Sequence, residues 1–220
     1  MSFLSELKTQ AHVLQTQQQG ASHDLAANTA AAEHACKVAN KYLQDLCAQL
    51  NVIRPPAHGS YSLDGKTQFP ALALRNFRCD ARKKMLRNAE AHDYIGVGWD
   101  LLAMDAPQTG RPAQHSVTVN FPPDLERVAQ RLATGRVPHE RKEQRHPETN
   151  KLQAYVFEYS IQVSGSLMLT PDHDRGEVIF RIANVGGFEV VSATYPASQV
   201  TQELMDELAK KLVGQVSRFG

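Results

Sequence analysis

A repeating seam of apolar residues over the first fifty residues constrains this chain more than any other feature. With Leu4 as heptad position a, the a series reads Leu4, Ala11, Gln18, Leu25, Ala32, Ala39 and Leu46, and the d series reads Leu7, Leu14, Ala21, Asn28, Ala35, Tyr42 and Gln49. Only Gln18, Asn28 and Gln49 interrupt it. A seam of this length predicts a long helix that buries one stripe against a partner, because a helix alone cannot remove its stripe from water.

The sequence permits two arrangements at Gly20, within the helix predicted over residues 1–50. Glycine inside a helix costs about 1 kcal/mol relative to alanine. Ser22 can cap a second helix that begins near His23. One continuous helix and two helices that meet at Gly20 both fit the sequence.

The apolar stripe broadens after Ala35. Heptad positions that coiled coils usually give to charged residues are apolar there, at Cys36, Val38, Leu43 and Leu50. A wide stripe suits packing on a sheet better than a narrow two-helix seam. We therefore expect residues 34–50 to lie on the globular body.

Residues 2–19 keep the narrow seam, and we expect them to project and to pair with a second chain. The oligomerisation residues would be Leu4, Leu7, Ala11 and Leu14. In the alternative, the whole segment folds back as a helical pair within one chain, since three heptads are near the minimum for a coiled coil.

Residues 51–70 predict a connector between the helical segment 1–50 and an α+β domain of residues 71–220. Pro55 and Pro56 end the helix near Leu50, because proline cannot continue the backbone hydrogen bonds. Inside the connector, Asp64-Gly65 predicts the tight turn of a short hairpin.

From Phe69 onward, the period of the apolar residues changes to two, which indicates strands. We expect strands over 69–81, 94–101, 117–121, 137–146 (an edge strand), 152–163, 167–170, 178–184 and 188–195. Pro122-Pro123-Asp124 opens a helix that Gly135 stops, and Ser198 caps a last helix that Gly214 ends. The fold class is α+β: a long N-terminal helix open to coiled-coil pairing, then a mostly antiparallel sheet with a mid-domain helix and a C-terminal helix.

Composition limits the partners and the compartment. Lysine and arginine total 24 against 23 aspartate and glutamate, a net charge of +1, so global charge favours neither nucleic acid binding nor disorder. The odd number of cysteines, three, suits reduced thiols in a reducing compartment. No apolar run approaches the ~18 residues of a membrane helix. We expect a cytoplasmic protein that does not enter membranes.

Motifs of catalysis and of cofactor binding are missing from the sequence. It contains no phosphate-binding loop, no nucleophile elbow and no Cys-x-x-Cys. The segment from His139 resembles a zinc-protease helix, but Glu143 stands where a second histidine is needed. The turn from Asp172 to Gly176 has only the first acidic positions of a calcium loop. We expect no metal and no cofactor, and the balance is against an enzyme.

Two basic clusters offer a nucleic-acid-binding alternative. The first comprises Arg75, Arg78, Arg82, Lys83, Lys84 and Arg87, and the second comprises Arg141, Lys142 and Arg145. If their strands lay side by side, their outward faces would form one stripe that neutralises phosphates. In the other interpretation, these charges keep exposed strands soluble and unpaired.

The leading hypothesis is a non-enzymatic oligomeric interaction or adaptor protein, in which the N-terminal helix self-associates and the sheet presents a charged face to a protein partner. The first alternative is a nucleic-acid-binding protein. The second is a small-molecule binder or enzyme with a pocket under the C-terminal helix, where Gly96 and Gly98 beside Trp99 leave room for a ligand.

Overall fold

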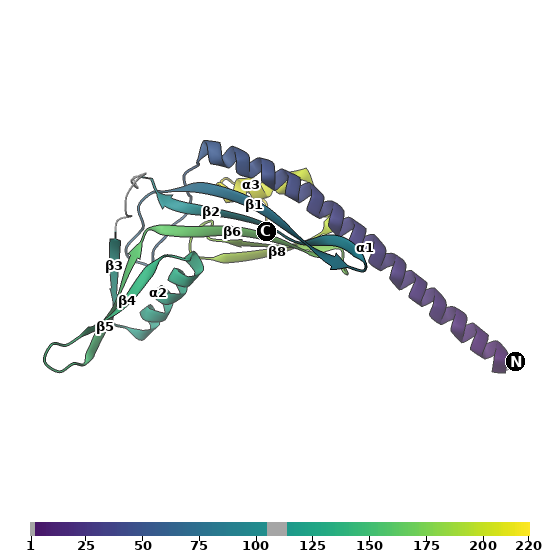
Figure 1. Cartoon of the computed structure of the whole chain (residues 1–220), viewed down its shortest axis with the longest axis horizontal. Coiled ribbons are helices and arrows are strands. Elements are labelled where there is room, and N and C mark those ends of the chain that lie inside the picture. Colours follow the sequence, from purple (N-terminus) through teal and green to yellow (C-terminus); the bar gives the residue numbers. More distant parts are fainter. Residues whose placement is uncertain (1–2, 105–113) are drawn as a thin grey trace.

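The computed structural model describes residues 3–104 and 114–220, without the side chains of residues 3–7, 9–11 and 13–23, and it confirms the α+β class. The elements are α1 Phe3–Ile53, β1 Leu72–Leu86, β2 Ala89–Ala103, β3 Gln114–Val119, α2 Pro122–Gly135, β4 His139–Arg145, β5 Leu152–Ser160, β6 Gln162–Asp172, β7 Glu177–Ala183, β8 Val190–Pro196, a 3₁₀ turn Ala197–Gln199 and α3 Gln202–Leu212. Figure 1 shows their arrangement.

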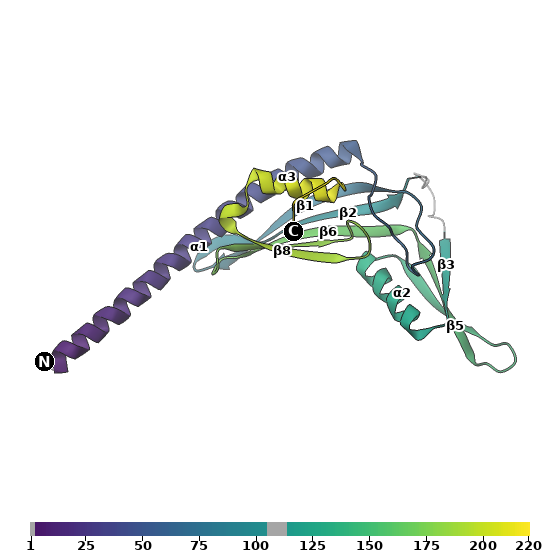
Figure 2. The same cartoon turned by 180° about the vertical axis from the view of Figure 1, so that it is seen from behind.

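Helix α1 is one helix that runs through Gly20. It ends at Ile53, three residues beyond the expected Leu50, because Arg54 takes a left-handed conformation (φ 50°) and donates its N–H to the Leu50 carbonyl (2.8 Å). Pro55 follows directly. The N-terminal part of α1 extends well beyond the sheets, as both sides of the molecule show (Figures 1 and 2).

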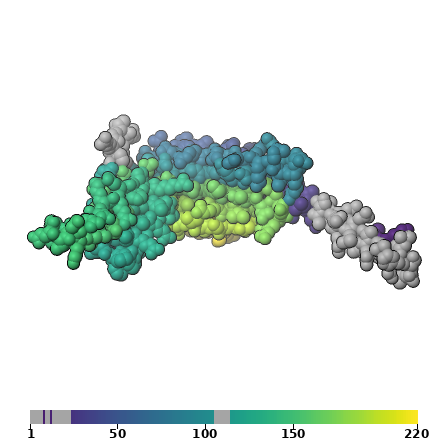
Figure 3. Space-filling view, turned by 60° about the horizontal axis from the view of Figure 1, so that its bottom comes forward, coloured from purple at the N-terminus to yellow at the C-terminus, as the bar shows by residue number. Residues whose placement is uncertain are grey.

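A five-stranded antiparallel sheet in the order β1-β2-β6-β7-β8 forms the centre of the body. The second half of α1 lies on one face together with α3 (Figure 2). The core between them contains Ala35, Ala39, Leu43 and Leu50 from α1, Ile95, Val97, Trp99, Leu101, Leu167, Leu169, Phe180 and Ile182 from the sheet, and Met205, Leu208 and Leu212 from α3. Over the middle of the opposite face, the strands themselves form the surface (Figure 3).

Strand β1 contains a bulge that the sequence pattern did not reveal. The pairing of β1 with β2 shifts between Arg75 and Arg78, where Asn76 takes a left-handed φ of 56°. Leu74 therefore faces the core before the bulge, and Phe77 faces it afterwards. The uninterrupted alternation expected from Phe69 to Ala81 is wrong, because an extra residue exchanges the two faces.

A three-stranded sheet in the order β3-β5-β4 stands at the end of the body away from the N-terminus (Figure 1). The strand expected over 152–163 is two strands, because the chain leaves β5 at Ser160 and enters the larger sheet at Gln162. The expected edge position of β4 is confirmed. Phe121 lies outside β3; it precedes α2 and is 58% exposed.

Two expected local details are wrong, one in a turn and one at a helix cap. At Asp64-Gly65, a single bridge joins Ser62 and Gln68, and the Asp64 carboxylate accepts the N–H groups of Lys66 and Thr67, so the turn is wider than two residues. The cap of α3 is Thr201, whose hydroxyl accepts the Leu204 N–H, whereas Ser198 lies in the preceding 3₁₀ turn.

Trp99 fills the centre of the core, and the described residues around it leave none of the ligand space that the sequence predicted beside it. The Trp99 side chain is 1% exposed and stacks on Phe77. Gly98 lies on the opposite face of the sheet, under the Arg78 side chain. The glycine that accommodates Trp99 is Gly165 on the neighbouring strand, where a Cβ atom would lie 2.0 Å from the indole ring.

We expect Gly165→Ala to destabilise the protein by roughly 1–3 kcal/mol, because the new methyl group overlaps a side chain that cannot move aside. Gly98→Ala is the matched control, since its methyl group meets only the flexible Arg78 side chain. Urea unfolding followed by fluorescence measures both, because Trp99 is the only tryptophan. Equal stability of the two variants would contradict this packing.

Candidate functional site

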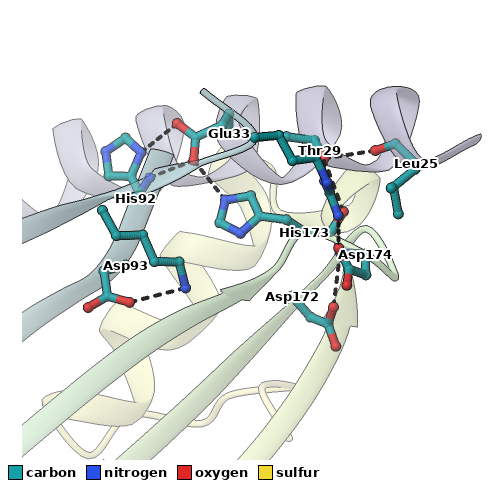
Figure 4. A network of polar contacts seen from close by, with 10 residues as sticks. Leu25, Thr29, Glu33, His92, Asp93, Asp172, His173 and Asp174 are labelled. Carbon is teal, nitrogen blue, oxygen red and sulfur yellow. Dashed lines mark hydrogen bonds and ion pairs between the residues drawn. The ribbon is translucent and has the colours of Figure 1, made fainter. Parts of the chain in front are cut away.

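A partly buried carboxylate holds α1 to the sheet near the point where the helix leaves the body. Glu33 on α1 accepts hydrogen bonds from the His92 backbone N–H (2.7 Å), from His92 Nδ1 (2.8 Å) and from His173 Nε2 (2.9 Å). Both histidines are 5% exposed. His92 comes from β2 and His173 from the β6–β7 turn, so one carboxylate joins three segments (Figure 4).

The Glu33 carboxylate is held in its ionised form. Burial alone would raise its pKa, but the hydrogen bonds from His173 and His92 outweigh that effect and place the pKa below the usual value of a glutamate. An ionised carboxylate only accepts hydrogen bonds, so each imidazole presents an N–H to it. No group of three metal-ligating side chains with metal-site geometry exists among the described residues. The arrangement therefore acts as an anchor for the helix.

One turn of α1 earlier, a second set of contacts joins the helix to the same hairpin ends. Thr29 accepts a hydrogen bond from Arg87 Nη1 (2.7 Å), and Arg87 also pairs with Asp174. Asn28 Nδ2 donates to the Asp174 carbonyl (2.8 Å), next to Gly176. These contacts and Glu33 together form what we call the upper anchor. Figure 4 shows Glu33, Thr29 and Asp174 within it.

Near the C-terminal end of α1, Asn51 forms the lower anchor. Its side chain donates to the Phe77 carbonyl and accepts the Phe77 N–H, each at 2.8 Å. The bulge in β1 removes Phe77 from the pairing with β2 and leaves both backbone groups available. The two anchors fix the position of α1 along the sheet.

The predicted oligomerisation residues lie on the part of α1 that extends beyond the body. The backbone of this part is helical, and the side chains of Leu4, Leu7, Ala11 and Leu14 lie outside the described residues. The upper anchor starts at Asn28, so the extended part of α1 lies on the N-terminal side of this residue.

The first basic cluster lies on β1 and the β1–β2 turn, where carboxylates of the same hairpin offset it. The ion pairs are Lys83–Glu90 (3.2 Å), Lys84–Asp93 (3.1 Å), Arg82–Asp93 (4.0 Å) and Arg78–Asp100 (3.9 Å). Arg87 pairs with Asp174 in the upper anchor, and Arg75 is half-buried beside the bulge. The acids Glu90, Asp93 and Asp100 come from β2, so the sequence alone does not show that they lie beside the cluster.

The second basic cluster lies on β4, at an edge of the smaller sheet. Lys142 pairs with Glu158 (2.5 Å), Arg145 pairs with Glu143 (2.6 Å), and Arg141 covers the ring of Tyr155 (3.8 Å to the centroid). Because β1 and β4 belong to different sheets, the two clusters do not form one stripe, and the side-by-side arrangement considered for them is wrong.

A hollow of about 220 Å³ lies at the C-terminal end of α3, between the sheet and the connector. Its lining is mostly apolar and includes Ile182, Val185 and Val191 together with Lys211. Small-molecule sites usually enclose roughly 300–1,000 Å³. Trp99 does not line this hollow, so the ligand pocket considered beside it is not formed there.

Comparisons with protein-family models, with curated proteins and with solved structures gave no significant match to this chain. Within the described part, no helix has both the length and the apolar character that crossing a membrane requires. We therefore infer function from the geometry of α1 and its anchors.

Sequence reasoning missed both anchors. Glu33 stands at heptad position b, a solvent position in a coiled coil, and only its place just before the stripe widens at Ala35 sets it apart. His92 and His173 lie far from Glu33 in the sequence. In the turn that contains His173, only the aspartates form a recognisable pattern. Asn51 could have been found only by knowing where β1 bulges.

We expect Glu33→Gln to reduce the free energy of unfolding by about 1–3 kcal/mol at pH 7, because a neutral amide cannot accept all three hydrogen bonds. Chemical denaturation measures the change. Glu126→Gln, on the exposed face of α2, is the matched control and should change stability by less than about 0.5 kcal/mol.

The stability gap between wild type and Glu33→Gln should depend on pH in one direction. The pKa of Glu33 is lower in the folded state, so its contribution is complete above the unfolded pKa and is lost as the pH falls through the folded pKa. The gap should therefore shrink below about pH 4. A gap that stays unchanged as the pH falls from about 4 to about 2 would contradict the assignment of an ionised Glu33.

The paired charges also predict that duplex and single-stranded DNA will not bind with the steep salt dependence of a phosphate-binding surface. Fluorescence anisotropy across a salt series measures this. Binding that weakens linearly in log salt, and that charge reversal at Arg78, Arg82 and Lys84 abolishes, would restore the nucleic-acid alternative.

Proposed function

We propose that this protein is a non-enzymatic interaction protein that self-associates through the N-terminal part of α1 and presents the open face of its five-stranded sheet to a protein partner. The observation that carries the proposal is the extension of α1 beyond the body that anchors its second half (Figures 1 and 2). Its three free thiols, all within the described ranges, agree with a cytoplasmic location.

The extended part of α1 needs a partner for physical reasons. Residues 3–23 span about 30 Å at 1.5 Å per residue. A helix of that length is marginal in water by itself, because its nucleation is costly and its stability normally comes from packing. The sequence places Leu4, Leu7, Ala11 and Leu14 on one seam. Pairing two such seams removes these side chains from water and stabilises both helices.

The second half of α1 cannot pair with a second chain in the same way, because its apolar side chains are already buried in the core. Ala35, Ala39, Leu43 and Leu50 are buried against the strands and α3. The narrow seam before Asn28 and the broad stripe after it therefore correspond to two different partners, a second chain and the sheet.

The open face of the sheet is the second surface in the proposal. Serine, threonine and arginine side chains alternate on it with the exposed apolar side chains of Met168 and Ile179. A mixed surface of this kind is typical of interfaces that form between separately folded proteins. Self-association through α1 would place two such faces in one particle.

Self-association is tested by size-exclusion chromatography with light scattering over a wide range of protein concentrations. We expect the wild type to have at least twice the mass of one chain. Leu7→Glu combined with Leu14→Glu should weaken association roughly 100-fold or more, because it buries carboxylates in an apolar seam.

Thr9→Glu combined with Thr16→Glu is the matched control. It adds the same charges at the same spacing, but at heptad position f, which faces away from the seam. The control should keep the wild-type mass. A wild type that is monomeric at every concentration, or a control that dissociates as the seam variant does, would overturn the proposal.

A further inference from the structure

Two cysteines face each other across the contact between α1 and β1. Cys47 lies on α1 and is buried, and Cys79 lies on β1 and is partly exposed. The lower anchor fixes their alignment, because Asn51 and Phe77 are bonded to each other. Four residues back along α1 cover about 6 Å, and two residues onward along β1 cover about 6.6 Å. Cys47 and Cys79 therefore lie at the same level.

The directions of the two side chains agree with this alignment. Residues two apart on a strand point to the same face, so Cys79 faces α1 as Phe77 does. Its sulfur lies 4.0 Å from Asn40 Oδ1 of the same helix. Small residues on this side of α1, including Ala39 and Cys36, allow the helix to approach the sheet closely.

The two thiols are also chemically unequal. A hydrogen bond from Cys47 lowers the pKa of Cys79, while the same bond and burial raise the pKa of Cys47. Strand β1 is an edge strand, so a reagent can reach Cys79 from the side of the sheet. Cys36 differs from both, because it is completely buried and burial raises its pKa to about 12.

We propose that Cys47 and Cys79 form a reversible disulfide that fastens α1 to β1 when a low-molecular-weight disulfide, such as oxidised glutathione, is present. The Cys79 thiolate attacks one sulfur of the reagent and releases one glutathione thiolate. Cys47 then attacks the Cys79 sulfur and releases the second. Two electrons pass from the protein to the reagent, and the two protein thiol protons go to the released thiolates.

The disulfide is a modification site separate from the extended part of α1, so it does not depend on self-association. It closes a ring of about 33 residues that contains the whole connector. Closing such a ring should raise Tm by roughly 5–10 °C. Reduction by glutathione would restore the free thiols and the original Tm.

The test incubates the folded, full-length protein in a series of glutathione redox buffers. It then unfolds the protein in urea that contains N-ethylmaleimide, so that every remaining free thiol is blocked, including the buried Cys36. Intact mass and cross-linked peptides are measured. We expect the loss of two hydrogen masses, one remaining alkylated thiol at Cys36 and a Cys47–Cys79 peptide. Cys36→Ala should form the same cross-link. Cys47→Ser should retain a glutathione adduct at Cys79, because the resolving thiol is absent.

Several results would overturn the proposal. A stable glutathione adduct at Cys79 of the wild type would show that the two sulfurs cannot reach bonding geometry. A cross-link that includes Cys36, or one between two chains, would show that the alignment is wrong. No reaction of the folded protein, under conditions in which the urea-unfolded protein reacts fully, would show that Cys79 is inaccessible.

Discussion

The apolar face of the five-stranded sheet is the constraint on which the rest of the structure depends. Strands β2, β6 and β7 place Trp99, Leu167 and Phe180 on one side, and that side must be covered. Helix α3 covers only part of it, so the second half of α1 has to lie there too. This requirement explains why the stripe of α1 widens after Ala35, and why the helix is part of the core rather than a separate appendage.

Apolar packing alone would allow α1 to slide or rotate on the sheet, and the two anchors prevent both movements. Glu33 and Asn51 are eighteen residues apart, about 27 Å along the helix. Each uses a polar group that the sheet would otherwise leave unsatisfied, the His92 N–H in one case and the bulged Phe77 backbone in the other. The anchored half of α1 therefore holds the extended half in a defined direction, as the proposed pairing with a second chain requires.

Patterns within single elements could be predicted from the sequence, whereas relations between elements could not. The seam of Leu4 and Leu7, the period of two around Val97 and the proline start of α2 each reflect local geometry, and the corresponding elements exist. The bulge at Asn76 and the division at Ile161 depend on which strand lies beside which, so an alternating pattern did not reveal them. The same reason explains why Asp93 was not seen to offset Lys84, and why Glu33 was not seen to meet two histidines.

We propose that α1 has two halves with two partners, the sheet and a second chain. Hydrogen exchange along α1, measured at a low and a high protein concentration, tests it most directly, because each amide reports on its own half. We predict that amides of residues 32–50 exchange slowly at both concentrations, and that amides of residues 3–20 exchange slowly only at the high concentration. Exchange of residues 3–20 at a rate independent of concentration would rule out pairing with a second chain, and fast exchange over residues 32–50 would rule out packing on the sheet.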